Sequence, residues 1–332
     1  MKSVTNVGMG ICCNFVAITI RPRVRIMNSS RSRVRVHKTF ATIFLFFLGL
    51  FFIVAGRARA SETRNVIVSI LPQKYFVEQI AGNRVHVTVM VPPGANPATY
   101  EPKPSQMKAL SEAQLYFSVG VPFEKAWLPR FRSVNPKMTV VDTRQGIKLY
   151  PISSKNQVLL PGKDKLLDPH IWLSPPLVII QARNILQGLS CQYPELTQSF
   201  RANFHSFANK IVALDIKLMD ILIGKGKEVG CSGRAFMVFH PSWGYFARAY
   251  GLRQIPVEQE GKEPKPSQLV NLMKSIKKLG IKVILVQPQF STKAAQILAE
   301  STGVRLVVAD PLAYEWDRNL LEVAKKLRES WK

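Results

Sequence analysis

The chain has few of the residues from which metal, redox and nucleotide sites are usually built. Its 332 residues include only four Cys and five His. No C-x-x-C pair occurs, which excludes a thioredoxin-type redox motif. Glycine-rich nucleotide loops, the G-x-S-x-G elbow and the H-E-x-x-H pair are also missing from the sequence. No enzyme motif is therefore present, and we expect a protein that is not an enzyme.

Acidic residues are scarce as well. The sequence has 21 Asp and Glu against 46 Lys and Arg, a formal net charge of +25. A basic balance can indicate binding to nucleic acid or to an anionic membrane surface. Beyond residue 60 the basic residues are scattered rather than gathered in one stripe. We therefore expect a basic surface and no nucleic-acid partner.

The first 60 residues contain no Asp or Glu and have the layout of a targeting segment. A positive stretch ends at Lys38, an apolar run covers 39–55, and Ala58-Arg59-Ala60 forms a small-x-small site. This layout predicts a secretory signal peptide that ends at Ala60 and directs the protein to a bacterial periplasm. Residues 1–26 fit no signal pattern and suggest a misplaced start codon. The apolar run of about 17 residues is at the low edge for crossing a bilayer, so an uncleaved membrane anchor is the alternative.

Two cysteines remain beyond that segment, Cys191 and Cys231. An exported compartment permits a disulfide between them. The sequence does not show whether their Cα atoms come close enough to be bridged, so the pairing stays open.

Strand-like and helix-like runs alternate along the rest of the chain. Short apolar runs predict strands at 65–71, 85–91, 115–119, 138–142, 235–239, 255–258, 282–286 and 304–309. Helical patterns cover 73–81, 103–113, 266–278, 292–301 and 316–331. Such alternation is typical of parallel sheets with crossover helices. We predict an α/β protein with two lobes, residues 61–175 and 229–332, each a mostly parallel sheet with flanking helices.

Residues 176–228 are predicted to connect the lobes through one long spine helix. Apolar residues recur at spacings of four and three, which places them on one helix face: Phe200, Phe204, Phe207, Ile211, Leu214, Leu218 and Ile221. The pattern predicts a helix over 194–223 that packs against both lobes and stops at Gly224. A coiled-coil dimer is the alternative, although the stripe covers only about three heptads.

Three polar residues stand where the structured segments are predicted to end. His240 follows the strand at 235–239, Asp310 follows the strand at 304–309, and His170 lies where the first lobe ends. The carboxyl ends of parallel strands border the crevice in which α/β proteins bind ligands. From position alone, these residues fit either a metal site or hydrogen-bonded caps.

Other candidate ligands have simpler interpretations. His86 and His205 are each predicted to be ordinary surface or packing residues, because a lone His rarely has partners. Glu258 and Glu260 are expected to be solvated loop carboxylates rather than an acid–base pair.

Several stretches of the chain resemble the periplasmic metal-binding receptors of zinc and manganese ABC importers, the ZnuA/TroA-like family. These stretches lie in the family's order and cover 94–102, 168–175, 239–246, 260–266, 287–291 and 309–312. The resemblance implies two lobes joined by a long helix, with a metal ion between them. It implies that His170, His240 and Asp310 are metal ligands, and that the partner is the importer's permease and ATPase complex. We expect a monomeric receptor for zinc, with manganese as the alternative.

One residue departs from the family pattern. The family's first His follows a Pro, but Ala98 follows Pro97 here. Glu101 could reach the site as the missing ligand if the loop turns, or water could complete an open zinc site. Oxygen donors from Glu101 and Asp310 would favour a manganese or iron(II) receptor. A degenerate receptor that acts as an interaction or adhesion protein is the remaining alternative, and a metal hydrolase would lack a general base.

Overall fold

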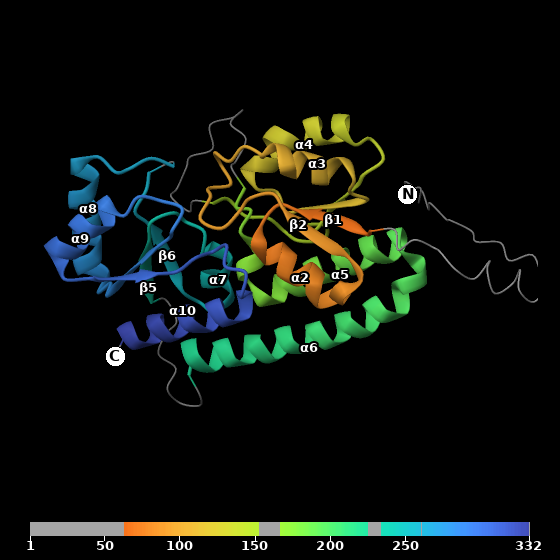
Figure 1. Ribbon diagram of the computed structural model, residues 1–332. Helices are drawn as coiled ribbons and strands as arrows, with labels where there is room; N and C mark the ends of the chain where they lie inside the picture. Colours follow the sequence, from red (N-terminus) through yellow and green to blue (C-terminus); the bar gives the residue numbers. More distant parts are fainter. Residues whose placement is uncertain (1–62, 153–166, 225–233, 260, 332) are drawn as a thin grey trace, which may run out of the picture. The chain divides into compact units, whose positions relative to one another are not determined.

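The computed structural model describes residues 63–152, 167–224, 234–259 and 261–331 (Figure 1). The predicted signal segment lies outside these residues. Within the described part of the chain, no helix is long and apolar enough to cross a membrane. Cys191 is exposed, and Cys231 lies outside the described residues, so whether the two cysteines pair stays open.

The first sheet contains four parallel strands in the order β2-β1-β3-β4. The strands are β1 (Asn65–Val68), β2 (His86–Val89), β3 (Leu115–Ser118) and β4 (Thr139–Asp142). The helices of this part are α2 (Leu71–Ala81), α3 (Pro104–Ser111), α4 (Pro122–Val134) and α5 (Pro175–Gln192), with short 3₁₀ turns η1 (Gly82–Arg84) and η2 (Ile171–Leu173). Each strand lies within a stretch for which the sequence predicts one.

The second sheet repeats this plan with four parallel strands in the order β6-β5-β7-β8. The strands are β5 (Ala235–Val238), β6 (Arg253–Pro256), β7 (Val283–Val286) and β8 (Arg305–Val308). The helices are α7 (Gly244–Ala249), α8 (Pro266–Leu279), α9 (Lys293–Thr302) and α10 (Trp316–Ser330). Two parallel α/β lobes are therefore confirmed, and β6 begins two residues earlier than predicted.

The two lobes share an identical hexapeptide at equivalent places. Glu-Pro-Lys-Pro-Ser-Gln occurs at 101–106 before α3 and at 263–268 before α8. In both copies the second Pro is the first helical residue, where its fixed φ suits the helix and its missing N–H costs nothing. In both copies the Gln side chain also accepts a hydrogen bond from the backbone N–H three residues earlier, at 3.0 Å in α3 and 2.7 Å in α8. The same local sequence thus starts the same helix twice.

The spine helix is α6 (Thr197–Leu222), which follows the 3₁₀ turn η3 (Pro194–Leu196). It packs against α2, α5 and α10, and Figure 1 shows it running beneath all three helices. Most of the predicted apolar stripe is buried within the chain, so this stripe does not form the interface of a coiled-coil dimer. Phe204 and Ile221 are only half-buried but pack against the core, and Leu222, which is outside the predicted stripe, is fully buried.

Strand β5 is buried on both faces because helices cover both sides of the second sheet. Phe236 and Val238 belong to the large core that also contains α6 and α10, while Ala235 and Met237 belong to a second core under α8 and α9. The alternation follows from the period of two along a strand. A strand buried on both faces has a continuous apolar sequence, and the apolar run at 235–239 predicts β5 in this way.

Three helices, α4, α5 and α7, were not predicted. Helix α4 contains an internal proline, Pro129. Helix α5 is almost uniformly apolar over its first two turns and therefore lacks a clear one-face period. Helix α7 has only six residues, and so short a segment carries little periodicity.

The packing of α6 predicts a contrast between two neighbouring side chains. Leu218 is fully buried, whereas Ile216 is 50% exposed on the same helix. We expect Leu218→Ala to lower the free energy of unfolding by about 2–5 kcal/mol, because the substitution leaves a cavity in the core. The matched Ile216→Ala variant should change it by less than about 0.5 kcal/mol. Urea denaturation of both variants measures the difference, and equal losses would show that α6 does not bury this face.

Candidate metal centre

The rings of His170 and His240 lie next to each other, although 70 residues of sequence separate them. Their ring centroids are 5.3 Å apart with an interplanar angle of 68°. Two imidazoles that bind one tetrahedral zinc ion through nitrogens about 2.0–2.1 Å from the metal place their ring centres roughly 5 Å apart. The spacing of the two rings therefore suits a shared metal ion.

His170 is held by a carboxylate that lies two residues earlier in the sequence. Its Nδ1 donates to Asp168 Oδ1 at 2.6 Å, and its backbone N–H donates to the same oxygen at 3.0 Å. Only 8% of His170 is exposed, and this burial lowers the pKa of its imidazole, although the carboxylate of Asp168 acts in the opposite direction. With Nδ1 protonated and bonded, the neutral ring presents the lone pair of Nε2 to a metal ion.

His240 has the same kind of support from a residue two positions beyond the end of the neighbouring strand β6. Its Nδ1 lies 3.0 Å from Glu258 Oε2, and its ring stacks on Phe290 with a centroid distance of 4.8 Å. Gln287 holds the backbone, since it accepts from the His240 N–H and donates to its carbonyl. The expectation that Glu258 is a solvated loop residue is wrong, because this side chain is only 6% exposed and bonds His240.

The strand register explains why Glu258 reaches His240. Val238 at the end of β5 pairs with Pro256 at the end of β6, so the residues two positions further along also lie side by side. The sequence places Glu258 and His240 at the ends of two predicted strands. Their contact could be predicted only once these two strands were known to be neighbours.

Asp310 follows β8 on the same edge of the second sheet. Its Oδ1 accepts from Gln289 Nε2 at 2.7 Å and from the Leu312 N–H at 2.9 Å. Trp172 connects this segment to His170, because its indole Nε1 donates to the carbonyl of Pro311 at 2.7 Å. Within the described ranges, no group of three or more His, Cys, Asp and Glu side chains is arranged to hold a metal ion. The assignment of Asp310 as a third ligand therefore stays a prediction.

The remaining candidates lie on the surface. Glu101 and Ala98 are exposed in the loop before α3, and the Ala98 N–H donates to Asn96 Oδ1 at 2.8 Å. The role of Glu101 as a ligand also stays a prediction. His86 and His205 are exposed, which agrees with their interpretation as ordinary residues.

Comparison with known proteins supports the resemblance found in the sequence. The profile of the family "Zinc-uptake complex component A periplasmic" matches residues 66–325. A crystal structure of ZnuA is 39% identical, with a TM-score of 0.72 over 80% of this chain and 98% of that one. A ZnuA deletion mutant with zinc bound is 40% identical, with the same TM-score over 81% of this chain and 98% of that one.

A curated relative is longer than this chain. The zinc-binding protein AdcA of Streptococcus pyogenes is 28% identical over 275 residues, which are 78% of this chain and 52% of AdcA. The chain thus spans about half the length of that relative. The region that matches the family profile, residues 66–325, includes both sheets, the spine helix and both histidines of the candidate centre. The chain therefore belongs to the ZnuA family of periplasmic zinc-uptake components.

Proposed function

We propose that this protein captures a Zn²⁺ ion and delivers it to an ABC importer. The observation that carries the proposal is the pair His170 and His240, with rings 5.3 Å apart and each Nδ1 next to a buried carboxylate. Imidazole donors suit zinc among the divalent metals. Hydrogen bonds that the far ring N–H donates to a carboxylate are the usual support for histidines that bind zinc.

The proposed ligand set contains His170, His240 and Asp310, with Glu101 or a water molecule as the fourth ligand. Asp310 supports this set because its segment is tied to that of His170 by the Trp172–Pro311 hydrogen bond. The carboxylate is also only half-buried, which leaves it free to take part in binding. A site with three protein ligands and one open position is familiar for zinc.

The partner and the cellular location of the protein belong to the same proposal. We propose that the receptor is exported by the predicted signal peptide, works as a monomer in the periplasm and docks on a permease and ATPase complex. The zinc-bound ZnuA relative and the family description support zinc as the cargo. The two imidazoles favour zinc over the manganese or iron(II) alternative, in which oxygen ligands would dominate.

Titration calorimetry of chelator-stripped protein lacking residues 1–60 tests the proposal. We expect one zinc ion to bind per chain with a Kd far below micromolar, and we expect manganese to compete poorly. Tighter binding of manganese would favour the alternative cargo. The absence of zinc binding at micromolar concentration would favour a degenerate receptor, for which Ala98 is the sequence evidence.

Glu258 provides a test that leaves both histidines in place. We expect Glu258→Ala to weaken zinc binding about 10- to 100-fold, because the imidazole of His240 loses the partner that fixes its tautomer and orientation. Glu263→Ala is the matched control, since Glu263 is exposed and has no role in the proposed site. Competition with a fluorescent zinc chelator measures both variants. Equal affinities would show that Glu258 does not support the site.

A further inference from the structure

The first residue of α7, Gly244, lies against the carboxylate that holds His170. A Cβ atom built on Gly244 would come within 2.8 Å of Asp168 Oδ2, closer than a methyl group and a carboxylate oxygen can pack. The other oxygen of this carboxylate accepts both hydrogen bonds from His170. Any side chain at position 244 must therefore displace the group that orients the imidazole.

The backbone conformation gives no reason for a glycine here. Gly244 does not have a positive φ, so alanine could adopt the same conformation. Alanine would also favour the helix more than glycine does. The close approach of Asp168 is the one observed feature that requires a residue without a side chain.

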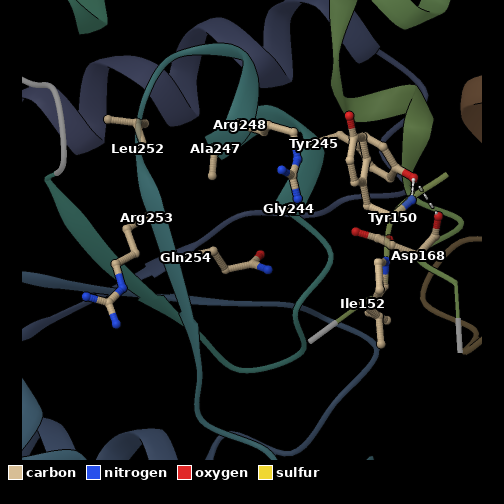
Figure 2. Close-up of a pocket in the computed structure, with 11 residues that line it drawn as sticks. Tyr150, Ile152, Asp168, Gly244, Tyr245, Ala247, Arg248, Leu252, Arg253 and Gln254 are labelled. Atoms are coloured by element: carbon tan, nitrogen blue, oxygen red, sulfur yellow. Dashed lines mark hydrogen bonds between the residues drawn. The ribbon is translucent and has the colours of Figure 1, made fainter. Parts of the chain in front are cut away.

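The backbone of Asp168 is hydrogen-bonded through both its N–H and its carbonyl, and its side chain is buried, so the residue cannot easily move away from Gly244. It is 4% exposed, its N–H donates to the Tyr150 carbonyl at 2.8 Å, and its own carbonyl accepts from Tyr245 Oη at 3.2 Å. Tyr245 Oη in turn accepts from the Tyr150 N–H at 3.0 Å. Figure 2 shows the two hydrogen bonds of Tyr245 Oη with Tyr150 and Asp168, at the wall of a cavity of about 210 Å³ that Gly244 also lines. With the backbone held, a methyl group at 244 would turn the carboxylate itself.

The ring of His170 cannot follow the turned carboxylate without changing the direction in which its Nε2 points. Its ring lies 5.1 Å from the Trp172 ring and 5.3 Å from the His240 ring, measured between centroids. Displacement of Asp168 would therefore either break the bond to Nδ1 or rotate Nε2 away from the position it shares with His240. Both results would misplace a metal ligand.

We propose that Gly244 is a positioning residue for zinc: its missing side chain lets α7 press against Asp168 and so aims His170 at the metal. The inference rests on the proposed function, in which His170 is a ligand. It assigns to the second lobe, through α7, part of the control over the orientation of His170 at the end of the first lobe. Gly244 does not itself contact the metal.

The test is a double-mutant cycle between Gly244 and Asp168. We expect Gly244→Ala to weaken zinc binding about 10- to 100-fold, as for loss of a residue that supports a ligand. In an Asp168→Ala background the same substitution should cost little further affinity, because the carboxylate that Gly244→Ala would displace is no longer present. Unchanged affinity for Gly244→Ala alone, or a full additional loss in the Asp168→Ala background, would overturn the proposal.

Gly188→Ala is the matched control. Gly188 is also a helical glycine, and its Cβ would lie 2.8 Å from Phe117 Cε1, but it is in the core of the first lobe. We expect this variant to lower Tm and to keep its zinc affinity. A comparable loss of zinc affinity in Gly188→Ala would show that general destabilisation, rather than Asp168, explains the effect.

A measurement on metal-free protein separates this inference from the proposed function. The ring ¹⁵N and ¹H resonances of His170 should shift in Gly244→Ala and stay in place in Gly188→Ala. If wild-type protein binds no zinc but these resonances shift, the proposed function fails and the positioning contact stands. If they do not shift, the positioning contact is wrong whatever the cargo.

Discussion

Zinc binding should fall by more than about 100-fold when His240 is replaced by alanine, since loss of a supporting residue alone costs 10- to 100-fold. The variant leaves His170 as the one imidazole in the proposed ligand set, and the remaining Asp310 carboxylate cannot replace a nitrogen donor. The fold should survive, because His240 is partly exposed at the end of β5 and its backbone is held by Gln287. Chelator competition at neutral pH measures the loss.

The control for His240→Ala is His205→Ala. His205 is exposed on α6 and makes an edge-to-face contact with Phe204, so its removal deletes an imidazole from the protein without touching the proposed site. Wild-type affinity is expected for this variant. Retention of nanomolar zinc binding by His240→Ala would show that the zinc site is not formed by His170 and His240.

Acidification should release the metal, because both imidazoles must be neutral to bind it. An ordinary His has a pKa of about 6.5, and affinity falls roughly tenfold per pH unit for each ligand histidine once the pH is below its pKa. Burial lowers the pKa of His170, so this histidine stays neutral to a lower pH than an exposed one. We expect constant affinity above about pH 7 and a loss on acidification, and His170 should contribute to this loss only at a pH below that at which an exposed His takes up its proton.

The variant Asp168→Asn tests how the pKa of His170 affects the pH dependence of zinc affinity. The negative charge of Asp168 raises the pKa of His170 against the larger effect of burial. Without that charge the pKa of His170 falls further, so the part of the acid-induced loss that His170 contributes should move to lower pH, while the affinity at pH 7.5 is weaker. Calorimetric titrations between pH 5 and pH 8 measure both quantities. Undiminished binding by the wild type at pH 5 would contradict a site built on two histidines.

Local signals in the sequence predicted much of the fold. Each strand of both sheets lies on or beside an apolar run in the sequence. In the fully buried strands β5 and β7 this run is continuous, because a strand covered on both faces needs apolar side chains in succession. The spine helix was equally clear, since seven apolar residues fall on one face. Helices such as α5 were missed because burial around most of the helix removes the one-sided period.

The positions of the candidate ligands were also available from the sequence. His240 and Asp310 follow predicted strands, and the resemblance to metal receptors pointed to them and to His170 before any geometry was known. The duplicated hexapeptide at 101–106 and 263–268 is a repeat in the sequence, yet its meaning emerged only when both copies were seen to begin equivalent helices.

The sequence by itself determined the α/β class, the long helix and which residues are chemically able to bind zinc, because these depend on residue type and on neighbours a few positions away. Only the tertiary structure decided which side chains meet. The pairing of β5 with β6 brings Glu258 to His240, and the packing of α7 brings Gly244 to Asp168. Such contacts depend on strand order and helix packing over long stretches of chain, and no local pattern of residues records them.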